Sequence, residues 1–143
     1  MIVISHEQMA LLAADRRRHT LAALCDVLRV SHPDRLRAFS PIALYRRVMQ
    51  AIERAEVYGL HGKADWRHYL ELAVLHGWDF DQRPTLIWMR ECLTDERIST
   101  PSARLARLID QCAHRAERDA RSRNLRARFA LRQVARAKRP EAS

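Results

Sequence analysis

Apolar residues recur every three or four positions along most of this chain, the spacing that places them on one side of a helix. Five segments show this pattern, at about residues 5–30, 41–58, 64–76, 86–93 and from 101 onward. Leu, Ala and Arg dominate while β-branched residues are sparse, so helix is favoured and no sheet is expected. The pattern predicts an all-α fold, a compact bundle of about five helices with a basic C-terminal extension that keeps its helix propensity.

Three of the predicted helices begin at a short side chain that can accept a hydrogen bond from a free backbone amide. Ser5, with Gln8 three residues later, predicts a capping box. Ser40 and Thr100 are each followed by proline, which is favoured at the first helical position. These signals place three helix starts without reference to any other part of the chain.

The first helix is expected to end at about Val30, before a break that contains proline. Its apolar stripe includes Met9 and Leu12. Charged residues interrupt this stripe over residues 15–19, so we expect one turn there to overhang solvent.

All three glycines lie between residues 59 and 77. We expect Gly59 and Gly77 each to end a helix, because glycine adopts the left-handed conformation that closes helices. The helix between them, about Ala64 to His76, is apolar around most of its circumference, which predicts the most buried element.

The positive charge is concentrated at the C-terminal end. The net charge is +9, and residues 114–143 carry ten Lys and Arg against three acidic residues, while residues 1–113 carry sixteen against fourteen. We therefore divide the chain into a helical domain, 1–113, and an Arg-rich C-terminal helix or tail, 114–143. The basic residues of the tail are Arg115, Arg118, Arg121, Arg123, Arg126, Arg128, Arg132, Arg136, Lys138 and Arg139. Such a face could neutralise phosphates, although basic helical ends are more often solvated or docked on a partner.

The N-terminal segment and the cysteines indicate the compartment of the protein and the state of its thiols. The apolar N-terminus is only four residues long, too short for a signal peptide or a membrane span, so a cytoplasmic protein is expected. Cys25, Cys92 and Cys112 are an odd count without paired spacing, and they are expected to be buried free thiols.

Two sets of residues could carry chemistry, and both are weakly specific. Asp79 and Asp81 could form a paired carboxylate site, but aspartates in a connector more often cap backbone amides, with Phe80 between them as a buried plug. His61, Asp65 and His68 have the spacing of metal ligands on one helical face, but Gly62 interrupts that helix, and Asp65 is better explained by the helix start. No nucleophile, nucleotide-binding or metalloprotease motif occurs. The sequence therefore predicts a non-enzymatic protein without cofactor or metal.

An ordered set of residues resembles a family of small helical bacterial proteins encoded beside type VI secretion genes for PAAR-type spike tips and their toxic effectors. The set consists of Glu7, Gln8, Met9, Arg54, Ala55, Tyr58, Gly59, Asp65, Tyr69, Leu70, Leu72, Gly77, Asp79, Phe80, Asp81, Pro84, Trp88 and Leu93. The similarity covers about residues 1–110. It implies an accessory role, as a chaperone or adaptor that holds an effector or its spike tip, or as an immunity protein that blocks the effector.

The aromatic and glycine-bounded segment is the predicted partner surface. Its candidate residues are Tyr58, Trp66, Trp78, Asp79, Phe80, Asp81 and Trp88. The alternative is that Trp78 and Phe80 are core plugs. A second hypothesis is a nucleic-acid-associated protein that acts through the basic tail. The sequence leaves the oligomeric state and the choice between chaperone and immunity protein open.

Overall fold

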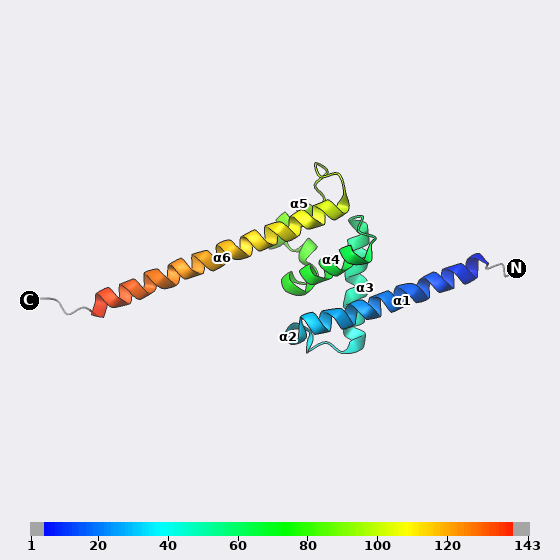
Figure 1. Cartoon of the computed structure of the whole chain (residues 1–143), viewed down its shortest axis with the longest axis horizontal. Coiled ribbons are helices and arrows are strands. Elements are labelled where there is room, and N and C mark those ends of the chain that lie inside the picture. Colours follow the sequence, from blue (N-terminus) through cyan, green and yellow to red (C-terminus); the bar gives the residue numbers. More distant parts are fainter. Residues whose placement is uncertain (1–4, 139–143) are drawn as a thin grey trace, which may run out of the picture. The chain divides into compact units, whose positions relative to one another are not determined.

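The computed structural model describes residues 5–138, and these residues form an all-α protein without strands (Figure 1). The predicted fold class is confirmed. The helices are α1 (His6–Ser31), α2 (Pro33–Leu36), α3 (Pro41–Val57), α4 (Lys63–His76), α5 (Ile87–Leu93) and α6 (Pro101–Lys138), with 3-10 turns η1 (Phe80–Gln82) and η2 (Pro84–Leu86) between α4 and α5.

The three predicted helix starts are confirmed by their hydrogen bonds. The hydroxyl of Ser5 accepts from the Gln8 amide at 3.2 Å, and the Ser5 amide donates to the Gln8 side chain at 3.0 Å, which completes the capping box. The hydroxyls of Ser40 and Thr100 likewise accept from the amide three residues later. Local side-chain chemistry therefore fixes where α1, α3 and α6 begin.

Gly59 and Gly77 have positive φ angles, +84° and +121°, and follow the last residues of α3 and α4 closely, as predicted. At Gly59 a side chain is excluded for a second reason. A Cβ atom placed there would lie 2.8 Å from Cγ of Pro101, the first residue of α6. The end of α3 thus requires a residue without a side chain.

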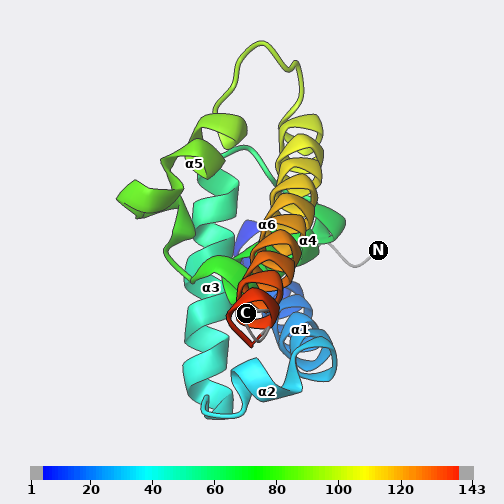
Figure 2. The same ribbon diagram turned by 90° about the vertical axis from the view of Figure 1, so that its left-hand side faces the viewer.

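Helix α3 packs against both α1 and α4, and Figure 2 shows α3 running upright beside them. Its buried stripe consists of Leu44, Val48, Ala51, Ile52 and Ala55. Helix α4 buries Tyr69, Leu70, Leu72, Ala73 and Val74 against this core. Five buried residues within six positions confirm that α4 is apolar around most of its circumference.

The first half of α1 differs from the prediction. We expected a single overhanging turn at residues 15–19, with Met9 and Leu12 facing inward, but residues 5–16 are all exposed. Met9, Leu11 and Leu12 expose 57%, 67% and 51% of their surface. The prediction was wrong because apolar spacing shows which residues share a face but not whether another element reaches that face. The three cysteines were expected to be buried, and each is partly exposed.

The chain divides into two units, a first that ends at Ala106 and a second that begins at Arg107, so that the division lies within α6. The sequence had suggested a division between residues 113 and 114. The second unit consists, as far as it is described, of the α6 helix alone, and every residue from 121 to 138 is exposed.

Candidate functional site

The predicted site residues Tyr58 and Asp81 meet in the core of the first unit. The carboxylate of Asp81 accepts three hydrogen bonds on Oδ2, two from Arg54, through Nε at 2.9 Å and Nη2 at 2.7 Å, and one from the Tyr58 hydroxyl at 2.8 Å. The Asp81 side chain is 1% exposed, whereas Arg54 reaches solvent along part of its length. We call these three residues the Asp81 cluster. It ties η1 to the end of α3.

Burial and pairing set the ionisation of this cluster. The hydrogen bond to Asp81 raises the pKa of the Arg54 guanidinium, which therefore stays charged. Burial, followed by the hydrogen bond to Asp81, raises the pKa of the Tyr58 hydroxyl. Burial raises the pKa of Tyr69 as well. The cluster is a charge-paired anchor whose donors hold their protons, an arrangement suited to fixing the chain rather than to moving protons.

Aromatic rings surround the cluster. The rings of Tyr69 and Phe80 are 5.1 Å apart between centroids, and those of Tyr58 and Tyr69 are 6.4 Å apart. Phe80 is fully buried, which confirms the prediction that it plugs the core. Phe80, Asp81 and Tyr58 are all buried, so the candidate partner surface loses these three residues.

The prediction that Asp79 and Asp81 cap backbone amides of the connector is wrong. The carboxylate of Asp79 pairs with Arg83, four residues later, at 2.8 Å, and Asp79 makes no side-chain cap of η1. Asp81 reaches Arg54 on another helix instead. Both carboxylates therefore pair with arginine side chains, one within the connector and one across to α3.

The three tryptophans lie apart from the Asp81 cluster, and each is partly exposed. The indole N–H of Trp66 donates to the carbonyl of Leu60 at 2.7 Å, and Arg17 of α1 lies 5.6 Å from the centre of its ring. Trp78 meets Phe39 edge to face, with ring centroids 6.1 Å apart. Of the predicted partner residues, Trp66, Trp78, Trp88 and Asp79 therefore retain accessible surface.

The site prediction omitted Arg54, although it belongs to the ordered residues of the resemblance. Arg54 and Tyr58 are four positions apart on α3, and the Arg54 guanidinium lies 5.8 Å from the Tyr58 ring centre. This spacing indicates a shared face. An arginine and a tyrosine on one face of a helix indicate that a buried carboxylate could accept hydrogen bonds from both.

A groove of about 770 Å³ runs between α1 and α4. Leu24 and Val27 of α1 contribute apolar surface to it, together with Ala64 of α4. Lys63 and Arg67 of α4 also line it, together with Glu71, whose carboxylate lies 3.9 Å from the Arg67 guanidinium. The volume of the groove lies in the range of ligand-binding pockets.

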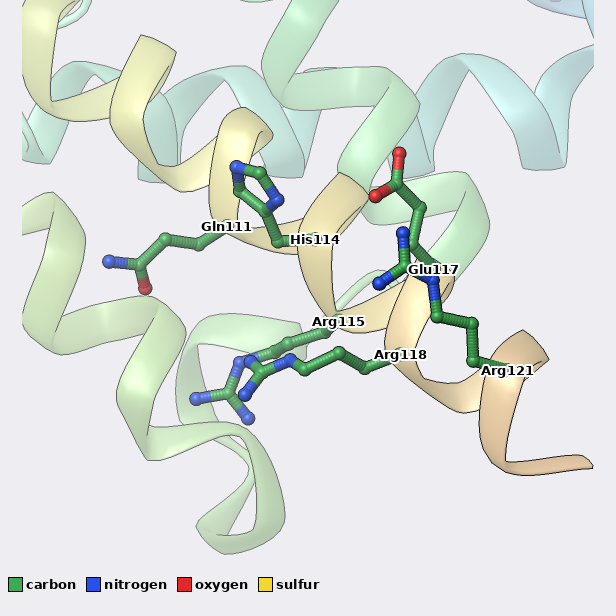
Figure 3. A pocket seen from close by; sticks show the side chains of 6 residues that line it. All are labelled: Gln111, His114, Arg115, Glu117, Arg118 and Arg121. Atoms are coloured by element: carbon green, nitrogen blue, oxygen red, sulfur yellow. The ribbon is translucent and has the colours of Figure 1, made fainter. Parts of the chain in front are cut away.

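The basic residues predicted in the tail are exposed on α6, except that Arg139 lies outside the described residues. Between residues 114 and 138 the acidic residues are Glu117 and Asp119. A hollow of about 520 Å³ lies along this helix. In the close view of Figure 3, Arg115 and Arg118 point away from Glu117. The hollow is also lined by Gln111, His114 and Arg121.

The described residues show neither a metal cluster nor a membrane helix. Over residues 5–138, no group of three or more His, Cys, Asp and Glu side chains could hold a metal ion, and His61, Asp65 and His68 form no such group. Asp65 instead accepts a hydrogen bond from Ser102 at 2.6 Å, in the first turn of α4. Within the same range, none of the helices combines the length and apolar character needed to cross a membrane.

No protein-family model, curated protein or solved structure matches the chain.

Proposed function

We propose that this chain is a non-enzymatic, cytoplasmic binding protein, a chaperone or adaptor for a type VI secretion effector or for its PAAR-type spike tip. The resemblance of its ordered residues to accessory proteins of that system supports the choice of partner. Four of those residues, Arg54, Tyr58, Phe80 and Asp81, form or adjoin one buried cluster, so the shared pattern has a physical basis in the fold.

The observation that carries a binding role is the apolar surface left on α1. Met9 and Leu12, three positions apart on one side of α1, are large apolar side chains that are each more than half exposed, and Leu11 on another side of the helix exposes 67% of its surface. The same helix lines the groove that it shares with α4. Neighbouring exposed apolar side chains mark a site for a protein partner, whereas single exposed apolar residues scattered over a surface do not. The partner's helix or loop would cover α1.

Co-purification tests this proposal. The tagged chain is expressed together with the effector and the spike-tip protein encoded beside it, and both are sought in the eluate. We expect recovery of one of them, and we expect the double variant Met9→Ser/Leu12→Ser to lose it. The control is Ile42→Ser/Val57→Ser, which removes two apolar side chains of α3 that are even more exposed, at 68% and 70%. Recovery of neither protein with the unmodified chain contradicts the proposal.

An immunity protein would use the same kind of contact with a different consequence. Deleting the gene of an immunity protein poisons the cell or its siblings, whereas deleting the gene of a chaperone lowers the abundance or export of the effector. We expect the second result. Toxicity without loss of effector would show that the contact serves to neutralise the effector.

A further inference from the structure

The exposed part of α6 carries a straight row of arginines. Successive residues of an α-helix are turned by about 100°, so residues spaced by three and four line one side. Arg118, Arg121, Leu125, Arg128, Arg132 and Arg136 follow spacings of three, four, three, four and four. We call them the arginine stripe. At about 1.5 Å per residue, the stripe is about 27 Å long.

All six residues of the stripe are exposed, and neither acidic residue of this segment occupies one of its positions. Five guanidinium groups thus follow one side of the helix, one turn apart except between Arg121 and Arg128, where Leu125 takes the intervening turn. Guanidinium groups bind phosphates in a bidentate manner and stay charged at every physiological pH. A ligand that matches this row must itself carry regularly spaced negative charge.

The opposite side of the helix carries mostly small side chains. Its positions, again at spacings of three and four, are occupied by Ala116, Ala120, Arg123, Ala127, Ala130 and Val134. Four of these six residues are alanine, so most of this side adds little to the width of the helix. The major groove of B-form DNA is about 12 Å wide and admits one α-helix, and continuous basic helices bind in it.

We propose that the arginine stripe of α6 binds double-stranded DNA, with the helix lying in the major groove. Arginines along both edges of the stripe contact phosphates of the two strands. Leu125 within the stripe and Phe129 beside it, both about two-thirds exposed, face the base edges, where apolar side chains contact thymine methyl groups. This binding is independent of the effector-binding role proposed for the first unit.

Two other polyanionic or amphipathic partners fit less well. A helix that lies on a membrane separates its large apolar residues from its cations, but here Leu125 falls among the arginines and the opposite side is mostly alanine. An acidic protein partner would draw its affinity from several buried apolar anchors, and the stripe offers one leucine among five arginines. DNA offers phosphates to the five arginines and base edges to Leu125, so it can contact every residue of the stripe.

The test measures binding of the whole chain to a fluorescent 30-base-pair duplex by anisotropy between 50 and 200 mM salt. If the five arginines each displace one counterion, the logarithm of the association constant should fall with the logarithm of salt concentration with a slope of about −4.5. Arg128→Gln/Arg132→Gln should make that slope shallower by about 1.8 and weaken binding at least tenfold at 50 mM salt. Glutamine is a good helix former, so helicity should be retained and can be checked by circular dichroism.

The control is Arg123→Gln/Arg126→Gln, which removes the same charge from the same helix outside the stripe. We expect it to lose less than half as much affinity as the stripe variant. Equal losses from both pairs would overturn the stripe as a site. The absence of duplex binding at 50 mM salt, or equal affinity for single-stranded DNA or double-stranded RNA, would also overturn the proposal. So would competition by polyglutamate as strong as that by DNA at equal charge, or binding to phosphatidylserine vesicles in place of DNA.

Discussion

Asp81 concentrates three hydrogen bonds on one oxygen atom, Oδ2, while its Oδ1 atom is buried without a hydrogen-bond partner among the described residues. A buried carboxylate is stable only if its donors remain in place, because an unpaired buried charge is costly. Arg54 supplies two of the three donors. The position of the connector after α4 therefore depends on a side chain of α3.

Replacing Arg54 by methionine should destabilise the protein by about 2–3 kcal/mol. The value lies below that of a fully buried ion pair because part of Arg54 is exposed. Urea unfolding measures it. Arg47→Met, an exposed position of the same helix, serves as control and should change stability by less than about 0.5 kcal/mol. A loss for Arg54→Met no greater than that of the control would mean that the cluster contributes nothing to stability.

His76 in the last turn of α4 adds a dependence on pH. Its partial burial, and secondarily the charge of Arg35, lower the pKa of its imidazole below the usual value of 6.5. The unfolded chain therefore binds this proton more readily, and stability decreases as pH falls below about 6.5. His76→Gln should flatten the decrease in melting temperature between pH 7 and pH 5. An unchanged slope would show that the decrease arises elsewhere.

The sequence alone could indicate two of the three residues of the Asp81 cluster. Arg54 and Tyr58 share a face because helical geometry relates residues four positions apart. Their acceptor stands 23 residues after Tyr58, beyond α4. No local rule selects Asp81 over Asp79, since both carboxylates flank Phe80 and the choice depends on how the connector folds back onto α3.

Helix boundaries are the features that local chemistry determines best. Ser5, Ser40 and Thr100 were identified because each cap bonds to an amide three residues away. Burial along α1 could not be identified in this way. Met9 and Leu12 have the spacing of core residues, but whether a neighbouring helix covers them depends on the tertiary arrangement of α3 and α4.

At the level of elements, the backbone conformation of Gly59 sets the direction in which the chain leaves α3 and enters the loop before α4. Gly59→Ala should destabilise the protein by at least about 1 kcal/mol, because φ is positive and a Cβ atom would press on Pro101. Gly62→Ala is the matched control. Gly62 has an ordinary φ of −91°, and a Cβ atom there would have open space. Thermal unfolding compares the two, and equal melting temperatures would contradict a special requirement at Gly59.

At the scale of the whole molecule, the chain up to Ala120 and the segment beyond it differ in charge and in burial. The chain up to Ala120 carries a net charge of +2, because eight of the basic residues and one acidic residue lie beyond it. Residues 121–138 are exposed without exception. Most of the positive charge thus belongs to a segment that buries little surface, and charge in such a segment is available for binding rather than for folding.

A chain that ends at Ala120 should therefore unfold within about 2 °C of the full chain, since residues 121–138 are all exposed and bury too little apolar surface to affect stability. It should also lose the part of its helical circular dichroism that residues 121–138 contribute. Leu105→Ala, at a position 1% exposed, shows that the assay is sensitive, because it should cost about 2–5 kcal/mol. A fall of more than about 5 °C on truncation would mean that the exposed end of α6 stabilises the fold, and the arginines there would then have a structural role in addition to binding.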